Sequence, residues 1–466
     1  MNMLQISDLM RSGKSVPIKE QIKLVVFLSI PAIFEQLVIT LMSYIDTAMV
    51  GSLGYMATAS IGVVSSTIWL LNGFVNAAAI GFSVQVAQYL GAGREKDSRD
   101  VLCQAILFNV IFGVALSALS ILLGQWLPRL LGAEASIQPY AKSYFCIVCA
   151  FLPFSMASAM YSGIFRCSGN LLIPSIMNVG MCFLDVIFNF FLIYPTRQIG
   201  NFTVWGANLG VSGAALGTGL AQACVGVSLL IFIIKRKGAL KLCGNEHWRF
   251  TKTCMYNAFI LATPAALEQT TLCLAQIVMT YVVAGMGAVS VAANYVAVQT
   301  EAICYLPAYG VAAAATALVG QSIGAGRTDM AKRFAYSTTA LGFGLVTITG
   351  SVLFFCAPFL SGLLTPEKEV IALSTRLLRI VAFSEPLFAV SIVIIGALRG
   401  VGDGKGPFFI NLCSMWGVRV LIVLLATRRY GVVGIWITMA AELTVRGILF
   451  LIRLMRGRWI NTKALS

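Results

Sequence analysis

The chain has 466 residues, of which 58% are hydrophobic and only 11% are charged. A soluble globular protein of this length needs more charge to cover its surface, so the composition excludes that class and indicates a membrane protein. A net charge of +15 would also suit a nucleic-acid-binding protein, but the placement of the basic residues follows a membrane topology instead.

Apolar segments with almost no charge recur along the whole chain. Each is long enough for a helix to cross a hydrocarbon core of ~30 Å, which takes about 20 residues. The segments are continuously apolar rather than alternating, which argues against a transmembrane barrel. We therefore predict an all-α integral membrane protein. Its twelve predicted transmembrane helices span residues 25–50, 57–85, 101–123, 140–163, 172–194, 211–234, 255–281, 288–317, 334–357, 373–395, 408–427 and 433–453.

The two halves of the chain are repeats of each other. Leu28 to Gln36 (LSIPAIFEQ) matches Leu261 to Gln269 (LATPAALEQ), and the same offset between the halves holds without a gap further along. A register kept over this distance indicates a duplicated architecture. The offset later becomes shorter, because the first half carries twelve extra residues near 195–209. Other matched pairs are Pro31 and Pro264, Glu35 and Glu268, Pro153 and Pro386, Arg166 and Arg399, and Asn178 and Asn411.

The basic residues favour one side of the membrane. If the first helix starts in the cytoplasm, 23 of the 33 Lys and Arg residues fall on the cytoplasmic side, as the positive-inside rule expects. We therefore predict that both termini are cytoplasmic, with Arg428 and Arg429 as an exception on the outer side. Positions 1–24 are polar and basic, so we expect no cleavable signal peptide.

The duplication predicts two lobes. Each half has an even number of spans and returns the chain to its starting side, so the halves should be related by an axis along the membrane normal, with a substrate pathway between them. The predicted parts are a cytoplasmic N-terminal segment (1–24), an N-lobe of six helices (25–234), a basic cytoplasmic linker (235–254), a C-lobe of six helices (255–453) and a cytoplasmic tail (454–466). Prolines inside the spans, each favouring a kink, are Pro31, Pro153, Pro264, Pro307 and Pro386.

Ionisable residues inside apolar spans are costly, so each is a candidate for function. In the first lobe, Asp185 and Asn189 lie one helical turn apart and share a face of the fifth span. Together with Asp46 of the first span and Thr218 of the sixth, they could form a site for H⁺ or Na⁺. Burial makes a carboxyl group hold its proton more tightly, which allows proton exchange nearer neutral pH. The competing interpretation is that these groups only hydrogen-bond between helices.

The second lobe lacks counterparts of these acids, because Met279 stands where the first lobe has Asp46. Its own candidates are Glu301 and Glu385. Tyr305 and Tyr309 follow Glu301 at helical spacing, so a carboxylate beside aromatic rings could attract an organic cation. A buried acid that is hydrogen-bonded to tyrosine is the alternative.

The remaining intramembrane charges suggest structural roles. Glu35 and Gln36 lie near the cytoplasmic end of the first helix and are repeated as Glu268 and Gln269. With Pro31, Arg166 and Arg399 they form a repeated motif for which we predict a structural or gating role, although Glu268 also remains a candidate for the second acidic site. Glu442 stands four residues before Arg446, which predicts an ion pair within one helix.

Motifs for other chemistry are missing from the sequence. It contains no G-x-x-x-x-G-K-[ST], so no ATP-driven mechanism is expected. The single His247 lies in the central loop, which argues against a histidine metal site. Cys146-x-x-Cys149 lies in a hydrophobic helix, which favours buried thiols over a redox pair. No nucleophile–base pair is evident, so we expect neither an enzyme nor a cofactor beyond a coupling ion.

Several motifs occur in order along the chain, some of them in both halves. They are Pro31 with Asp46-x-x-x-Val-Gly51, Gln88-x-x-Gly-Ala-Gly93, Val319-Gly-Gln-x-x-Gly-Ala-Gly326, Gly163-x-x-Arg166, Gly396-Ala-Leu-Arg-Gly-x-Gly-Asp403 and Gly213-Ala-Ala-x-x-Thr218. Through these motifs the chain resembles the multidrug and toxic compound extrusion (MATE) family over residues 25–453. The resemblance implies a V-shaped protein of two six-helix lobes that exports organic compounds in exchange for H⁺ or Na⁺.

The resemblance also implies roles for individual residues. In family members, an Asp of the first helix, an Asn-x-x-x-Asp of the fifth and a Thr of the sixth form the ion site. Asp46 and Thr218 match this pattern in type, whereas the fifth-helix pair is reversed, as Asp185 then Asn189. Acids of the seventh, eighth and tenth helices serve some members as a coupling or substrate site. Those in the same helices here are Glu268, Glu301 and Glu385.

The sequence therefore predicts a secondary antiporter of the bacterial cytoplasmic membrane that expels amphipathic, often cationic organic compounds by alternating access, and that works as a monomer. Its expected partners are small organic cations and the lipid bilayer, without nucleic acid. The nearest alternative is a flippase for lipid-linked saccharides. A cleft for anionic diphosphates should be basic, yet the only intramembrane arginines are Arg419 and Arg446. An integral membrane enzyme and a non-transporting scaffold are further alternatives, which a transport assay would separate.

Overall fold

The computed structural model describes residues 17–131, 133–199, 202–235, 240–242, 246, 248–365 and 367–461. Several regions of the sequence analysis lie wholly or partly outside these residues. They are positions 1–16 of the N-terminal segment, positions 236–239, 243–245 and 247 of the predicted linker, which include His247, and positions 462–466 of the tail.

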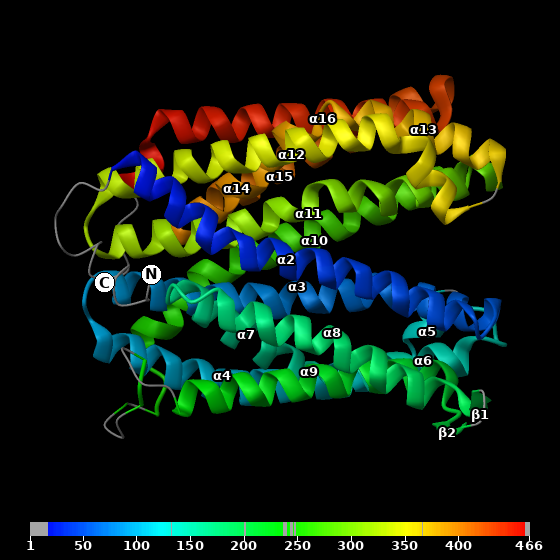
Figure 1. Cartoon of the computed structure of the whole chain (residues 1–466), viewed down its shortest axis with the longest axis horizontal. Coiled ribbons are helices and arrows are strands. Elements are labelled where there is room, and N and C mark those ends of the chain that lie inside the picture. The colour runs from blue at the N-terminus through cyan, green and yellow to red at the C-terminus, as the bar shows by residue number, and fades with distance from the viewer. Residues whose placement is uncertain are drawn as a thin grey trace. The chain divides into compact units, whose positions relative to one another are not determined.

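Helices make up nearly all of the described chain (Figure 1). Among the described residues, ten helices are long and apolar enough to cross a membrane, and two bent helix pairs raise the number to twelve if each pair is one span. The prediction of a multi-pass, helical membrane protein is therefore confirmed. The unbent spans include α2 (Ile18–Gly51), α3 (Tyr55–Gly91), α4 (Glu95–Gly124), α8 (Leu172–Ile193), α9 (Gly210–Lys235), α10 (Lys252–Ala284), α11 (Ala288–Gly324) and α12 (Thr328–Leu364).

The two bent pairs are matching elements of the repeat. Helix α6 (Gln138–Ala150) meets α7 (Leu152–Cys167) at a bend of 46°, and α13 (Lys368–Ala382) meets α14 (Glu385–Val401) at 57°. Pro153 and Pro386 stand in the first turns of α7 and α14, where a missing N–H breaks no intrahelical bond. The kinks predicted at these two prolines are present as breaks between helices.

The other prolines do not interrupt their helices. Pro31, Pro264 and Pro307 lie inside α2, α10 and α11, each of which continues through its proline.

The end of the chain contains irregular helix geometry. Helix α15 (Lys405–Ser414) passes into a π-helical segment, Met415–Val420, and then into α16 (Leu421–Arg456). Gly431 interrupts α16 with a φ of 56°, a conformation that glycine adopts without a steric penalty. This break divides the last two predicted spans. The remaining short elements are α5 (Leu127–Leu130) and a 3₁₀ turn at Arg458–Asn461.

The twelve extra residues of the first half form a β-hairpin. Strand β1 (Pro195–Ile199) pairs antiparallel with β2 (Phe202–Ala207). The repeat predicted the place of the insertion but not its structure, so the hairpin is an addition to the predicted all-α fold. It connects the end of α8 to the start of α9.

The chain forms two compact units. Unit 1 contains the described residues up to Leu37, Gly91–Gly93 and those from Thr263 onwards, and unit 2 contains Val38–Leu90 and Arg94–Ala262. Both α2 and α10 therefore pass from one unit into the other within a continuous helix. The predicted domain boundaries, which keep each of these helices in one lobe, remain a prediction.

Glycines of neighbouring helices explain how α2 and α10 pack. In unit 1, a Cβ added to Gly310 of α11 would lie 2.6 Å from the backbone nitrogen of Ile33 in α2. In unit 2, a Cβ on Gly81 of α3 would lie 2.8 Å from the backbone oxygen of Ala258 in α10. Such contacts need glycine, because no larger side chain lets two helix backbones approach so closely. The repeated halves thus use the same packing device.

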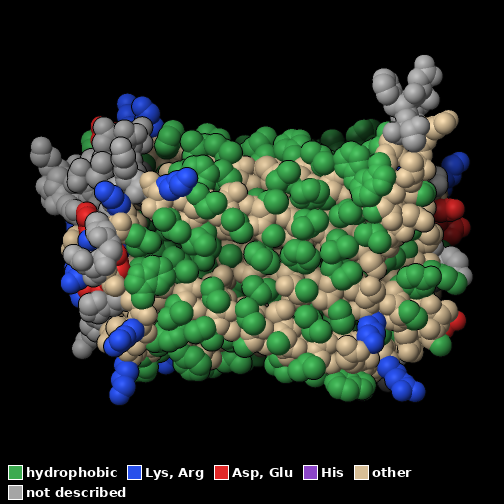
Figure 2. Space-filling model, turned by 90° about the horizontal axis from the view of Figure 1, so that it is seen from below, with side chains coloured by type: hydrophobic (Ala, Val, Ile, Leu, Met, Phe, Trp, Pro, Cys, Tyr) green, Lys and Arg blue, Asp and Glu red, His purple; other side chains and the backbone are tan. Residues whose placement is uncertain are grey.

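The surface matches a hydrocarbon environment. On the face shown in Figure 2, hydrophobic side chains cover most of the middle, and Lys and Arg lie towards the two ends. Elsewhere on the molecule, helix α12 also exposes large hydrophobic side chains: Ile348, Phe355 and Phe359 are 66%, 76% and 68% exposed. Exposed side chains of this size are stable in lipid and would favour aggregation in water.

Candidate functional site

Unit 2 brings together an acid from α2 with an acid and an amide from α8. The Nδ2 group of Asn189 donates hydrogen bonds to Oδ1 of Asp46 at 2.9 Å and to Oδ1 of Asp185 at 3.1 Å. Asp185 and Asn189 are buried, and Asp46 is partly buried. One amide therefore connects two carboxyl groups that lie far apart in the sequence.

Thr218 of α9 completes the group that the sequence analysis assembled from three helices. Its side chain interacts with that of Asp185, and the carboxyl groups of Asp46 and Asp185 are close enough to interact with each other. Two ionised carboxylates at such a place would repel each other. The arrangement therefore suits a pair of acids that holds a single proton.

Glycines on α9 allow this close approach. A Cβ on Gly217 would lie 2.1 Å from Oδ1 of Asn189, and one on Gly213 would lie 2.5 Å from the backbone oxygen of Leu192. The two glycines are four residues apart, so they form one smooth face of α9 against α8. Gly217 was not among the predicted site residues, although it directly precedes Thr218 in a Gly-rich helix.

The oxygen of the Asn189 amide is the unusual atom of this site. Oδ1 is buried and has no hydrogen-bond donor among the described residues. A half-turn of the amide group would exchange Oδ1 and Nδ2 and bring an oxygen towards the two carboxyl groups. In the present orientation the site suits a proton. After rotation, the amide oxygen would face the two carboxyl groups, and a cation such as Na⁺ would then be needed between these oxygens.

Unit 1 contains a second pair of buried acids. Glu301 of α11 and Glu385 of α14 are 5% and 0% exposed, and their side chains interact directly. Among the described residues, no amide, guanidinium or hydroxyl donor reaches either carboxyl oxygen of Glu385. Two ionised carboxylates would repel each other strongly in such a place, so this pair also requires a proton or another cation.

Glu442 is held by two arginines and a serine. Its Oε1 accepts hydrogen bonds from Nε of Arg446 and from Oγ of Ser414, both at 2.7 Å, and its Oε2 lies 3.8 Å from Nε of Arg419. The predicted ion pair between Glu442 and Arg446 is confirmed. The contribution of Arg419, which lies in the π-helical segment, was not predicted from the sequence.

The tyrosines of α11 pack as aromatic rings. The ring of Tyr305 lies 5.1 Å from that of Phe388 and 6.3 Å from that of Tyr309. Arg446 stands over the other side of this group, 5.7 Å from the centre of Phe388. Tyr309 is 45% exposed. These tyrosines lie on the same helix as Glu301 in unit 1, and their role beside its carboxyl group remains a prediction.

Glu268 is fully paired. Nη2 of Arg399 donates to its Oε2 at 3.0 Å, and Nδ2 of Asn411 donates to its Oε1 at 2.7 Å. A carboxylate with a cation and an amide as partners is less suited to exchange an ion than the pair Glu301 and Glu385. Glu268, Arg399 and Asn411 all belong to matched pairs of the repeat, whose first-half members are Glu35, Arg166 and Asn178.

The first-half members fall in different units. Glu35 is 1% exposed and belongs to unit 1, whereas Arg166 and Asn178 belong to unit 2. Each of the three has polar or electrostatic partners. Gln36, beside Glu35, is partly buried.

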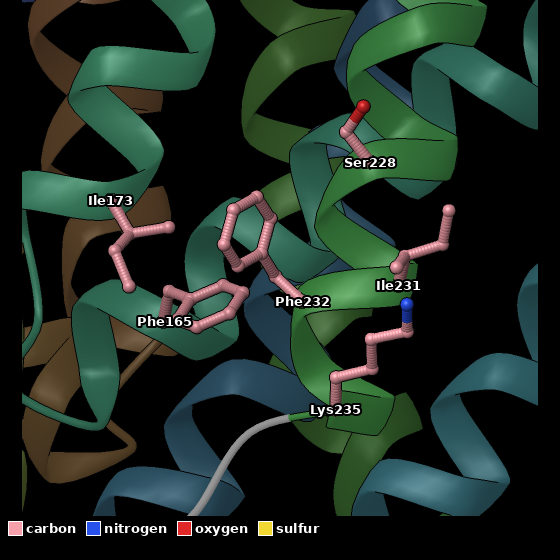
Figure 3. Close-up of a pocket in the computed structure, with 6 residues that line it drawn as sticks. All are labelled: Phe165, Ile173, Ser228, Ile231, Phe232 and Lys235. Atoms are coloured by element: carbon pink, nitrogen blue, oxygen red, sulfur yellow. The ribbon is translucent and has the colours of Figure 1, made fainter.

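A separate pocket of about 460 Å³ opens in unit 2 between the ends of α7, α8 and α9 (Figure 3). It is lined by Phe165, Ile173, Ser228, Ile231, Phe232 and Lys235. None of the predicted site residues lines it. Its one charged group is a lysine, which does not suit an organic cation.

Internal duplication and carboxyl groups buried in each unit are together typical of membrane transporters. Comparison with known proteins identifies the class more closely. A sequence model of the family described as MatE matches residues 31–191 and 264–425, which is more than half of the chain. The chain belongs to the MATE family of membrane transporters and is not an enzyme.

Curated relatives match over almost the full length. The chain is 25% identical over 453 residues to a protein of Thermotoga maritima described as a probable multidrug resistance protein NorM, covering 96% of this chain and 94% of that protein. It is 26% identical to the uncharacterized transporter YisQ of Bacillus subtilis, covering 92% and 93%. A crystal structure of a MATE protein in complex with MaL6 matches with a TM-score of 0.88 at 19% identity, covering 97% and 98%. This last likeness shows the shared fold.

Proposed function

We propose that this transporter is a cation-coupled antiporter that expels amphipathic, often cationic organic compounds in exchange for H⁺ or Na⁺. The observation that carries the proposal is the contact of Asp46, Asp185 and Asn189 within unit 2. Burying three polar groups from two helices among apolar residues costs free energy. Such a cost indicates that the groups serve a function. The names of the multidrug-resistance relatives support the cargo class.

The mechanism follows from differential binding. Taking up one cation lowers the negative charge of the acid pair from two to one, which weakens the repulsion and favours the arrangement in which Asp46 and Asp185 share a site. Losing the cation leaves two carboxylates that repel each other and favours their separation. Asp46 lies on α2, a helix whose first part belongs to unit 1 and whose second part belongs to unit 2. The state of the acid pair can therefore act on a helix that joins the units, which is what alternating access requires.

The acid pair of unit 1 is the proposed second site. Glu301, Glu385 and Glu442 form a cluster with Arg419 and Arg446, so three acids face two cations. One negative charge remains unless a proton or a cationic substrate supplies the balance. The aromatic rings of α11 lie on the same helix as Glu301 and favour an organic cation. We therefore assign substrate recognition to this cluster and coupling to Asp46 and Asp185.

A flippase for lipid-linked diphosphates is the less favoured alternative. Such a cargo needs unpaired basic groups. Arg446 and Arg419 both interact with Glu442, which leaves them poorly placed to bind a phosphate. The remaining features of the proposal are two lobes of six helices, cytoplasmic termini, a bacterial inner membrane and function as a monomer. They rest on the repeat and on the distribution of basic residues.

The test is efflux of ethidium from proteoliposomes under an imposed pH gradient or Na⁺ gradient. Wild-type protein should transport under one of the two gradients, and Asp46→Asn should lose that transport while remaining folded. Asp97→Asn is the matched control, because Asp97 is an exposed acid of the same unit that pairs with Arg94. Undiminished gradient-driven efflux by Asp46→Asn would refute the coupling role. Absence of transport by folded wild-type protein under both gradients would favour the flippase.

A further inference from the structure

The β-hairpin belongs to only one of the two repeats, and the mechanism above does not use it. The backbone nitrogen of Asn208 donates to the backbone oxygen of Tyr194 at 3.0 Å, and that of Leu209 donates to the oxygen of Leu192 at 2.9 Å. These bonds close the hairpin onto the last turn of α8. The same repeat carries Asp46, whereas the other repeat has Met279 at that position and lacks the twelve extra residues. The hairpin and the α2 acid therefore occur together.

Tyr194 joins this end of α8 to the end of α2. Its hydroxyl group lies 2.9 Å from Oγ of Ser52 and donates to the backbone oxygen of Met49 at 3.3 Å. Oγ of Ser52 donates to the same oxygen at 2.6 Å. Met49 lies in the last turn of α2, where carbonyl groups have no partner within the helix. Tyr194 and Ser52 together satisfy one of these carbonyls.

Arg197 of β1 holds the tyrosine ring. Its guanidinium group lies 4.3 Å from the ring centre of Tyr194 and 4.4 Å from that of Phe190. Cation–π contacts of this length restrict the positions of both rings. Phe190 follows Asn189 directly in α8. The hairpin thus contacts the helix that presents the amide as well as the tyrosine that reaches α2.

An apolar cluster supports the same junction. It contains Val50 of α2, Ile193 of α8, and Val211 and Ala214 of α9, with Met49 and Tyr194 packed against it. Val50 follows Asp46 by one helical turn, and Ile193 follows Asn189 by one helical turn. The junction therefore lies one turn from the site on both helices.

We propose that Tyr194, held by Arg197 and the hairpin, is a positioning residue of the Asp46–Asn189 site. It fixes the last turn of α2 against the end of α8 and keeps the Asp46 carboxyl within hydrogen-bonding distance of the Asn189 amide. Preorganised ligands bind a cation more tightly than ligands that must first be brought together. This inference rests on the proposed function of the site in ion coupling.

The test compares Tyr194→Phe with wild type in two measurements. The first is the dependence of ethidium efflux on the concentration of the driving cation in proteoliposomes. Loss of one hydrogen-bonding hydroxyl should raise the concentration for half-maximal efflux about fivefold, with the maximal rate largely kept. The second is hydrogen–deuterium exchange of residues 46–53, which needs no transport and should become faster.

Three variants serve as controls. Tyr140→Phe changes an exposed tyrosine at the same end of unit 2 and should alter neither measurement. Arg197→Ala should shift both measurements in the direction of Tyr194→Phe, because the tyrosine ring loses its cation. Arg197→Lys keeps a cation and should restore much of the wild-type behaviour.

The outcomes separate the two proposals. Faster exchange in α2 with unchanged cation dependence would overturn the positioning role, because the tyrosine would then only stabilise the helix end. Unchanged exchange would overturn it as well. Gradient-driven efflux retained by Asp46→Asn would overturn the proposed function and with it the role of Tyr194. Loss of efflux in Asp46→Asn together with an unaffected Tyr194→Phe would overturn the inference about Tyr194 alone.

Discussion

The contact between Gly217 and Asn189 gives a sharp prediction for Gly217→Ala. The new Cβ would lie 2.1 Å from Oδ1, 3.0 Å from Cγ and 3.1 Å from the backbone nitrogen of Asn189. The first distance is far below any van der Waals contact, so the amide must move. Movement breaks its hydrogen bonds to Asp46 and Asp185, at 2.9 and 3.1 Å.

The magnitude follows from these two bonds. A hydrogen bond to a charged group contributes about 1.5–3 kcal/mol and one to a neutral group about 0.5–1.5 kcal/mol. With one proton on the acid pair, the loss of both bonds should cost at least ~2 kcal/mol. Alanine is favoured over glycine inside a helix by about 1 kcal/mol, which offsets part of the loss. The net destabilisation of folded unit 2 should be ~1 kcal/mol or more.

The assay combines thermal unfolding of the purified protein with gradient-driven ethidium efflux. Gly217→Ala should unfold at a lower temperature and should lose most of its coupled efflux. Gly180→Ala is the matched control, because Gly180 lies in α8 of the same unit and a Cβ there would meet nothing within 4 Å. That variant should be as stable as wild type or more so, with normal efflux. A Gly217→Ala protein with wild-type stability and wild-type efflux would refute the packing argument.

Three further predictions concern the buried charges. Asp185→Asn should abolish coupled efflux. The double variant Asp185→Asn with Asn189→Asp should recover part of it, since one acid and one amide are again present. No recovery in the same vesicle assay would show that the order of the two residues is essential. Glu268→Gln should lower the unfolding temperature, because a broken buried pair costs about 3–5 kcal/mol. The double variant Glu268→Gln with Arg399→Gln should lose much less stability than the two single changes added together. Additive losses would contradict the pairing. Glu442→Gln should be among the most destabilising of single changes, because it leaves two arginines unpaired, and an unchanged melting curve would refute that account.

Much of the fold could be predicted because lipid imposes simple rules. A span must be apolar for about 20 residues, and both repeat halves obey this rule at matched positions. The bends at Pro153 and Pro386 were predicted from the prolines, which stand in the first turns of new helices. The same expectation was less informative at Pro31, Pro264 and Pro307, where each helix continues through its proline. Helix ends were less predictable. Helix α4 begins at Glu95, although its apolar run begins near residue 101, because a helix continues into the polar region where hydropathy gives no signal.

Local spacing also predicted the contacts that stay within one helix. Asp185 with Asn189, and Glu442 with Arg446, are each four residues apart and are bonded in the structure. Contacts between distant helices were beyond such reasoning. The link from Ser414 to Glu442 is an example, because no period of the sequence relates the two residues.

The repeat also marks residues that form long-range contacts. The matched residues Glu268, Arg399 and Asn411 form one bonded group in unit 1. Their common offset from Glu35, Arg166 and Asn178 was already visible in the sequence. The hairpin gave no such clue, because an insertion present in one half has no partner with which to compare it.

The central claim is that substrate and coupling ion favour different states of one protein, and ion release on substrate addition tests it most directly. Purified protein in weakly buffered detergent would be mixed with ethidium while a pH dye reports protons, and in a parallel sample ²²Na⁺ release would be followed. The account predicts that wild-type protein releases one of the two ions in saturable amounts and that Asp46→Asn releases none, although it still binds ethidium. Binding of ethidium to wild-type protein without release of either ion would contradict it.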